Sequence, residues 1–305
     1  MAIKPSVIVT VLLAGNLSAA EPIITTRYVA IDNVCAWPNL ATLRDGTIVA
    51  TIFNQPSHGR AEGDVDVWAT RDGLFWAKRG TAAPHEDSAN RMNVAAGVAN
   101  NGDLLVLSSG WSLKKDDRGK VLSLVNVLAP WVCRSADGGV TWKVDKDSFP
   151  RATEGRTEFI PFGDVLPGGD GTLRVTCYAR DKKTKQRLDL FRSIDDGKSW
   201  TFAEAVSGAP QHPGHLMRLK DGRLLVTYGN RIKGQFGVLA RLSADDGKTW
   251  GEPLTLVSDL LSGDCGYPAS AQMRDGKILT AYYSNGAPAH RRYHMGVVIW
   301  QPPAK

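Results

Sequence analysis

Carboxylates and a tyrosine stand beside the predicted β-strands of this chain, where they could do chemistry. The carboxylates are Glu62, Asp64, Glu158 and Asp264, and Tyr267 follows shortly after the last of them. Two carboxylates across a cleft are the usual arrangement of an enzyme that hydrolyses a glycosidic bond, and a tyrosine beside a base can act as a nucleophile. These residue types therefore favour acid–base or nucleophilic chemistry on a sugar.

Basic, amide and aromatic side chains in the same segments could bind the substrate. Guanidinium groups suit a carboxylate or a sulfate, and a histidine can contact substrate or transfer a proton. A pair of histidines in one loop without a third ligand, and four widely spaced cysteines, do not have the spacing of a metal site. We therefore expect no metal and no cofactor, and the candidate substrate-binding residues are Arg156, Arg231, His212, His215, Asn93, Trp111, His58 and Arg91.

Turns of one kind recur along the chain and separate short apolar runs. Each contains an Asp-Gly or Asn-Gly pair, which supplies the positive φ that a tight β-hairpin needs. No long stretch has the apolar period of a helix. The sequence therefore predicts five similar hairpins, with turns at residues 45–46, 101–102, 170–171, 221–222 and 275–276.

An octapeptide that begins with serine and ends with tryptophan follows three of these hairpins. The copies are Ser135–Trp142, Ser193–Trp200 and Ser243–Trp250, with a degenerate copy at Ala69–Trp76. Its hydroxyl and carboxylate can satisfy backbone donors in a turn, and its tryptophan can pack between neighbouring sheets. The repeating unit is therefore four antiparallel strands in about fifty residues, the size of a propeller blade.

The repeats predict an all-β fold, a single β-propeller of four-stranded antiparallel blades. The count of hairpins gives five blades. The last unit reaches the end of the chain before its fourth strand, whereas Thr25–Ile31 is a predicted strand without a hairpin partner. We expect this N-terminal strand to close the propeller, which would leave no open sheet edge.

The octapeptide resembles the Asp-box, S-x-D-x-G-x-T-W, of the sialidase superfamily. Ser135–Trp142 and Ser243–Trp250 match it fully, and Ser193–Trp200 has serine in place of threonine. The resemblance implies a propeller, with six blades as in typical sialidases as the alternative count. It also implies that the Asp-boxes lie on the face opposite the substrate.

The resemblance assigns candidate roles to four of the residues above. Tyr267 stands just ahead of the first strand of the last blade, where sialidases place their nucleophilic tyrosine, and Glu158 is the candidate base beside it. Glu62 or Asp64 could provide the general acid. Sialidases have an Arg-Ile-Pro motif in their first blade, whereas this chain has Ala-Trp-Pro at residues 36–38.

The sequence thus predicts an exported, sialidase-like glycoside hydrolase that acts in exo fashion on an acidic or decorated glycan. Two alternatives stay open. One is a polysaccharide lyase acting on a uronate-containing glycan, in which tyrosine and histidine would move protons beside an arginine-neutralised carboxylate. The other is a propeller that binds a glycan without catalysis.

The first twenty residues differ in composition from the rest of the chain. They have a short positive start, an apolar run at residues 7–15 and small residues at 18–20. The run is too short to span a bilayer and is typical of a secretory signal peptide. We expect residues 1–20 to be removed, residues 21–305 to form the propeller, and the mature protein to be secreted or periplasmic with no membrane span.

The net charge of the chain is +6, which is compatible with an acidic partner. The lysines and arginines are scattered, and no basic run alternates with aromatic residues as a nucleic-acid surface would require. We therefore expect a glycan or oligosaccharide as the partner, and no nucleic acid.

Overall fold

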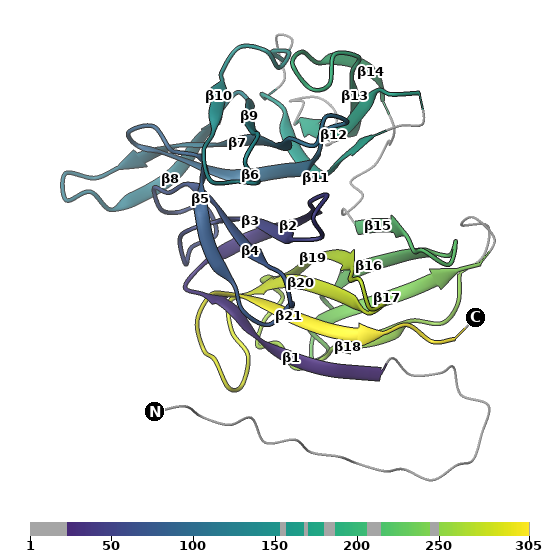
Figure 1. Cartoon of the computed structure of the whole chain (residues 1–305). Coiled ribbons are helices and arrows are strands. Elements are labelled where there is room, and N and C mark those ends of the chain that lie inside the picture. The colour runs from purple at the N-terminus through teal and green to yellow at the C-terminus, as the bar shows by residue number, and fades with distance from the viewer. Residues whose placement is uncertain are drawn as a thin grey trace.

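The computed structural model describes residues 23–152, 157–167, 170–179, 187–205, 215–244 and 250–304. The predicted signal peptide and the candidates Arg156 and His212 lie outside these ranges. The described residues form strands and loops (Figure 1). In this part of the chain, no helix is long and apolar enough to cross a membrane.

The strands follow one another through short turns and longer loops. The first eleven are β1 (Ile23–Asp32), β2 (Cys35–Thr42), β3 (Ile48–Phe53), β4 (Val65–Thr70), β5 (Ala77–Ala83), β6 (Ala89–Val98), β7 (Leu104–Lys115), β8 (Val121–Val127), β9 (Trp131–Ser135), β10 (Lys143–Asp145) and β11 (Ile160–Pro167). The others are β12 (Leu173–Ala179), β13 (Arg187–Ser193), β14 (Thr201–Ala205), β15 (His215–Arg218), β16 (Leu224–Asn230), β17 (Gly237–Ser243), β18 (Leu254–Val257), β19 (Cys265–Gln272), β20 (Ile278–Ser284) and β21 (His294–Gln301).

The strands pair into three four-stranded sheets and one larger sheet. The four-stranded sheets have the orders β2-β3-β4-β5, β15-β16-β17-β18 and β1-β21-β20-β19. The larger sheet has the order β10-β9-β7-β6-β11-β12-β13-β14, with β8 added on β7. It joins two antiparallel groups of four through a short parallel pairing of β6 with β11. Four antiparallel strands per repeat unit are therefore confirmed.

The predicted Asp-Gly and Asn-Gly turns connect the first two strands of each unit. Between β2 and β3, Gly46 has φ 81°, which a residue with a side chain rarely adopts. The carboxylate of Asp45 accepts a 2.9 Å hydrogen bond from the backbone N–H of Thr47, which stabilises the turn. The turn chemistry that the sequence predicted is therefore present in the structure.

The octapeptides at Ser135–Trp142 and Ser193–Trp200 form turns between the third and fourth strands. In the copy between β9 and β10, Asp137 accepts hydrogen bonds from the Ser135 hydroxyl at 2.7 Å and the Thr141 hydroxyl at 2.6 Å. The copy between β13 and β14 repeats this pattern around Asp195. Part of the copy at Ser243–Trp250 lies outside the described residues. The carboxylate of the octapeptide therefore stabilises its own turn in the two copies that are described throughout.

The N-terminal strand completes the sheet of the last unit. β1 pairs antiparallel with β21 from Ile23 opposite Gln301 to Asp32 opposite His294. The two ends of the described chain therefore lie side by side, as Figure 1 shows for the purple and yellow strands.

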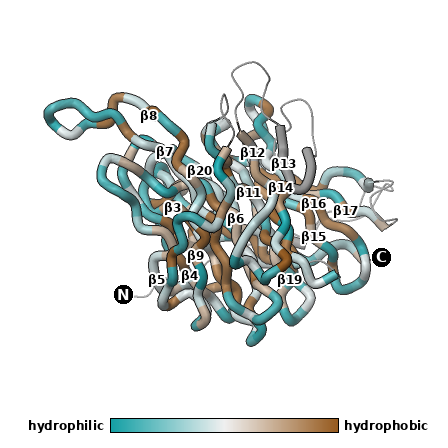
Figure 2. Tube along the Cα trace, turned by 90° about the horizontal axis from the view of Figure 1, so that it is seen from above, coloured by the Kyte–Doolittle hydropathy of each residue, from teal (hydrophilic) through white to brown (hydrophobic). Residues whose placement is uncertain are grey.

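The hydrophobic core lies between neighbouring sheets. Val49 and Val67 of one unit pack with Leu104 and Val106 of the next, and these four side chains are buried. Figure 2 shows that many hydrophobic segments run along the strands, whereas hydrophilic segments dominate the loops. Because the buried side chains lie on the strands, the loops at the two ends of the strands can carry function.

The first strands of the five units lie next to one another in the order β15, β19, β2, β6, β11. In an antiparallel pair the start of one strand lies beside the end of the next. The start of each first strand and the end of each second strand therefore lie at the same end of the sheet. The octapeptide turns that the structure describes lie at the opposite end of the strands. There Asp196 accepts a 2.7 Å hydrogen bond from the backbone N–H of Asn100 in a hairpin turn.

Candidate functional site

The candidate site lies where β2 and β19 begin, and a bulge in β19 presents Tyr267 there. Gly266 pairs with Tyr283 of β20, but Ala269 pairs with Ala281, so β19 holds one extra residue in between. Tyr267 has φ 46°, a conformation that costs a bulky residue about 1–3 kcal/mol and that is concentrated at functional sites. The fold therefore holds the backbone of Tyr267 in a strained conformation, at the end of the strands that carries the candidate residues.

A matching irregularity in β2 presents Trp37 beside it. Cys35 pairs with Phe53 of β3 and Asn39 with Thr51, which leaves two extra residues in β2. Trp37 has φ 40° and, like Tyr267, precedes a proline. Two neighbouring units thus each place an aromatic residue in the same region through a bulge in the first strand.

Aromatic rings surround these two residues. The ring centroids of Trp37 and Tyr267 are 5.2 Å apart with an interplanar angle of 81°, an edge-to-face contact. Phe162 and Tyr283 lie 5.5 and 5.8 Å from the Tyr267 ring. The guanidinium carbon of Arg231 lies 4.8 Å from the same ring centroid, within the range of a cation–π interaction. Rings of this kind suit the apolar face of a sugar.

Asp264 is the polar centre of the site. Its carboxylate accepts a 2.7 Å hydrogen bond from the Tyr283 hydroxyl and a second bond from the Tyr293 hydroxyl. Nδ1 of His58 lies 2.9 Å from the same carboxylate. The loop after β3, the loop before β19, the end of β20 and the segment before β21 therefore meet at one carboxylate.

The contacts of Asp264 set its protonation state. Burial works against ionisation of the carboxyl group, but the hydrogen bonds from His58, Tyr293 and Tyr283 outweigh it and lower the pKa to about 2. Burial, and then the charge and hydrogen bonding of Asp264, raise the pKa of both tyrosines above the usual value. At neutral pH the site thus contains an ionised carboxylate between two protonated phenols.

Two partners of Asp264 can reach a ligand. The Tyr283 side chain is fully buried, whereas His58 is exposed and Tyr293 is partly exposed. An ionised carboxylate only accepts hydrogen bonds, so Nδ1 of His58 must carry the proton. Nε2 is then left to exchange a proton with a substrate, in a histidine that the carboxylate orients.

Two further candidates, Arg231 and His215, contact the strand that carries Tyr267. Nε and one Nη of Arg231 donate to the carbonyl of Cys265 at 3.2 and 2.9 Å, which leaves other guanidinium hydrogens for a ligand. His215 is buried, with Nε2 2.9 Å from Asp164, and its Nδ1 accepts a 3.3 Å bond from the Ser270 N–H. Both residues therefore lie at the site and have structural partners.

The other candidate carboxylates are engaged elsewhere. Glu62 has a lowered pKa because of its hydrogen bond to Lys115, 2.6 Å away. Asp64 accepts bonds from the backbone N–H and Nδ1 of His85 at 2.8 and 2.5 Å. Glu158 pairs with Arg151 in its own loop at 2.8 Å. The pairing of Glu158 with Tyr267 and the role of general acid for Glu62 or Asp64 stay predictions.

The candidates of β6 and β7 also contact other protein groups. Arg91 is buried, donates to Glu86 at 2.9 Å, and lies over the ring of Trp131 at 3.6 Å. Asn93 is buried and donates to Ser109 at 3.3 Å. Trp111 packs against the aromatic cluster of the site. Of these three side chains, that of Trp111 belongs to the same cluster as Tyr267.

Sequence reasoning assigned no role to Tyr283 and Tyr293, although both bind Asp264. Tyr283 lies in the apolar run of β20 and cannot be distinguished from a core residue by its pattern. Tyr293 lies in the loop between β20 and β21, at the end of the strands where the site is located. Its position after a second strand is the signal that places it among the residues at this end of the strands.

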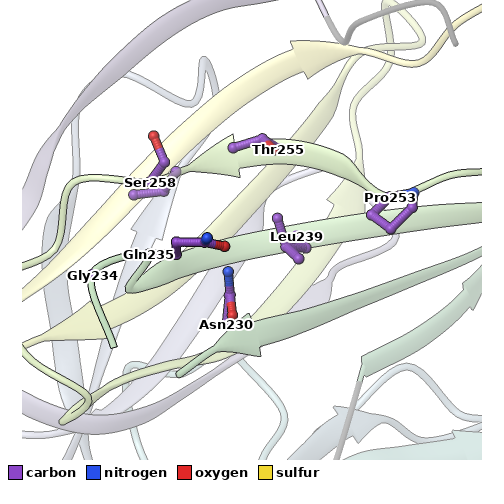
Figure 3. A pocket seen from close by; sticks show the side chains of 8 residues that line it. Asn230, Gly234, Gln235, Leu239, Pro253, Thr255 and Ser258 are labelled. Atoms are coloured by element: carbon purple, nitrogen blue, oxygen red, sulfur yellow. The ribbon is translucent and has the colours of Figure 1, made fainter. Parts of the chain in front are cut away.

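A separate pocket of about 370 Å³ lies beside β16, β17 and β18 (Figure 3). None of its lining side chains ionises, so it offers hydrogen bonds without an acid or a base. The lining residues are Asn230, Gly234, Gln235, Leu239, Pro253, Thr255, Val257 and Ser258. Among the residues that the structure describes, no group of three histidine, cysteine or acidic side chains could hold a metal ion.

Comparison with known proteins agrees with this architecture. The model of the BNR repeat-like domain matches residues 164–279, which include Asp264 and Tyr267. A sialidase from Micromonospora viridifaciens is 24% identical over 265 residues, which are 79% of this chain and 40% of the sialidase. The chain thus spans less than half of the length of this curated relative.

Solved structures with the same fold include both a protein of unknown function and sialidases. The former, from Dyadobacter fermentans, has a TM-score of 0.73 and 19% identity, over 93% of this chain and 98% of its own. Trypanosoma rangeli sialidase has a TM-score of 0.55 and 16% identity, over 89% of this chain and 55% of its own. A Hadza microbial sialidase gives 0.57 and 15%, over 87% and 65% of the two chains.

The fold and the comparisons define an all-β protein of sialidase-like architecture. More narrowly, residues 164–279 match the BNR repeat-like domain, and the chain is similar to sialidases in sequence and in fold.

Proposed function

We propose that this protein is a sialidase-like glycoside hydrolase that acts in exo fashion on an acidic or decorated glycan. One observation carries the proposal: an ionised Asp264 binds an exposed His58, beside the strained, ring-flanked Tyr267. A proton donor, a nucleophile and a ring-stacking surface are the parts that glycoside hydrolysis requires. The matches to sialidases support the same reaction class.

Each of these residues has a role in the proposal. His58, oriented by Asp264, gives a proton to the leaving group and later activates water. Tyr267 attacks the anomeric carbon while the bond to the leaving group breaks, and its phenolic proton passes to Glu158, the base predicted for it. A neutral phenol avoids repulsion from an anionic substrate. Arg231 offers its remaining guanidinium hydrogens to a carboxylate or sulfate of that substrate.

The test compares turnover of a glycan panel by wild type, Asp264→Asn and His58→Gln. We expect the wild type to release a saturated monosaccharide. Both variants should lose at least about a hundredfold in kcat, as removal of general acid–base catalysis does. Equal turnover by wild type and Asp264→Asn would refute the proposal.

The His58–Asp264 contact also favours a second function, a polysaccharide lyase. A histidine oriented by a carboxylate could remove a proton beside a uronate whose carboxylate is neutralised by Arg231. The product would then absorb in the ultraviolet because it is unsaturated. Binding to the same glycan without any product would instead indicate a non-catalytic, glycan-binding propeller.

We also infer that the five units are the five blades of one propeller that β1 closes. The neighbouring first strands and the pairing of β1 with β21 support this count. A crystal structure with a sixth blade would contradict it.

Export is a further part of the proposal, with residues 1–20 as the signal peptide and residues 21–305 as the mature propeller. The apolar run and the small residues before residue 21 support it. N-terminal sequencing of the protein from a periplasmic extract or culture medium should start near residue 21, and an intact N-terminus there would contradict processing.

A further inference from the structure

The bulge that holds Tyr267 is bracketed by contacts from the preceding unit. On its N-terminal side, Arg231 donates to the carbonyl of Cys265 through Nε and Nη2 at 3.2 and 2.9 Å. Next to this contact, a Cβ on Gly266 would come within 2.8 Å of the Cα of Gly229. The backbones of β16 and β19 therefore approach each other closely at this point, which leaves little room for the bulge to move.

On the C-terminal side of the bulge, the contact is a single histidine. The backbone N–H of Ser270 donates to Nδ1 of His215 at 3.3 Å. Nδ1 must therefore be unprotonated, and Nε2 must carry the hydrogen that points to Asp164, 2.9 Å away. Asp164 thus selects the tautomer that can accept the Ser270 bond, in the way that a carboxylate orients a histidine in other sites.

The segment that provides Asp164 also reaches the matching bulge of β2. The amide of Asn39 donates to the carbonyl of Gly163 at 2.6 Å, two residues after Trp37. Residues 163 and 164 of β11 are therefore tied to both strands that present an aromatic ring to the site. The positions of Trp37 and Tyr267 consequently depend on one short segment of a third unit.

We propose that His215 is a positioning residue for Tyr267, with its tautomer set by Asp164. His215 acts through the Ser270 N–H, which fixes the C-terminal end of the bulge and so the direction of the Tyr267 ring. This inference rests on the proposed function where it concerns turnover. The geometric part concerns the backbone of β19 and can be tested without any substrate.

The test uses two substitutions of His215. One removes the acceptor for the Ser270 N–H, and the other keeps an acceptor. His215→Phe keeps a planar ring without an acceptor, whereas His215→Asn keeps an oxygen near the position of Nδ1. The matched control is Ser193→Ala, because Ser193 is equally buried and accepts a 2.7 Å bond from the Gly197 N–H in an octapeptide turn. The control loses a buried hydrogen bond without touching β19.

Two readouts follow the geometry directly. Amide hydrogen exchange reports the Ser270 bond, and a ¹³C-labelled tyrosine signal, assigned with Tyr267→Phe, reports the environment of the ring. We expect at least tenfold faster exchange and a displaced signal in His215→Phe, with both close to wild type in His215→Asn and in the control. Unchanged exchange and an unchanged signal in His215→Phe would overturn the proposal.

Turnover gives the second half of the test. With the substrate found for wild type, His215→Phe should lower kcat about tenfold to a hundredfold at a similar KM, because the loss is one of orientation. Ser193→Ala should lower the unfolding temperature and leave kcat per folded molecule unchanged. A displaced Tyr267 signal with normal kcat would overturn the positioning role alone, whereas normal turnover by Asp264→Asn would overturn the proposed function alone.

Discussion

Trp37 and Tyr267 occupy matching positions in neighbouring first strands, and their rings meet edge to face with centroids 5.2 Å apart. Each residue has a positive φ, stands two residues after a buried cysteine and precedes a proline. The proline cannot donate a backbone hydrogen bond to the neighbouring strand, which is compatible with the bulge in which each aromatic lies. The repeat unit has thus been used twice to build one aromatic surface.

Tyr267 and Tyr293 should respond differently to loss of their hydroxyl groups. Tyr267→Phe keeps the ring contacts but removes the proposed nucleophile, so kcat should fall at least about a thousandfold. Tyr293→Phe removes one of the donors to Asp264, so kcat should fall only about tenfold. Steady-state kinetics of the folded variants measure both, and the opposite ranking would assign the nucleophile to Tyr293.

Asp264 should make stability depend on pH below about pH 4. Its pKa falls from 3.8 in the unfolded chain to about 2 in the fold, so its contribution is present above pH 3.8 and is lost as the pH falls through 2. The shift corresponds to about 2 kcal/mol of unfolding free energy. Denaturant unfolding of wild type and Asp264→Asn should therefore differ by about this amount at pH 6.

The same pair of proteins provides the control for that prediction. Other carboxylates with lowered pKa values, such as Asp137, are present in both proteins and cancel in the difference. The gap between the two unfolding free energies should narrow between pH 4 and pH 2. A gap that stays constant over this range would show that the carboxylate charge does not stabilise the fold.

Asp137→Ala should affect stability and not chemistry. The carboxylate accepts bonds from the hydroxyls of Ser135 and Thr141 and from the backbone N–H groups of Val140 and Thr141. Loss of these bonds should lower the free energy of unfolding by about 1–3 kcal/mol. Thermal unfolding and kcat per folded molecule test this together, and a large loss of kcat in folded protein would place the octapeptide in the active site after all.

The four cysteines should be unreactive thiols in the native protein. Cys35, Cys133, Cys177 and Cys265 are all buried. Burial raises the pKa of Cys133 to about 12 and that of Cys265 to about 11, which keeps them protonated. A thiol reagent should therefore detect almost none before unfolding and four afterwards, and a smaller number in the unfolded, unreduced chain would reveal a disulfide.

The strand units and their turns could be predicted because their causes are local. An Asp-Gly pair forms a hairpin turn from its own backbone geometry, as Asp45 and Gly46 do. Asp137 forms all of the contacts described above within its own octapeptide. Antiparallel strands return to the same end of the sheet every second strand, and this alternation places the segments of Asp264, His58 and Tyr267 at one end.

The partners within the site could not be predicted, because they come from distant segments. His58 and Asp264 are 206 residues apart in the chain, and they meet because β2 and β19 are neighbours in space. Tyr283 has the pattern of a core strand residue, and only the direction of its hydroxyl shows that it binds Asp264. Tertiary structure alone decides which carboxylate the tyrosines share.

The sequence by itself determined that this chain is an all-β array of repeated four-stranded units, with polar and aromatic residues beside the strands. Only the tertiary structure decided which of those residues act together. It assigned Glu62 to Lys115 and Arg91 to Glu86, and it brought His58, Tyr283 and Tyr293 to Asp264. The reason is that turn formation depends on adjacent residues, whereas the pairing of charges depends on how separate sheets pack against one another.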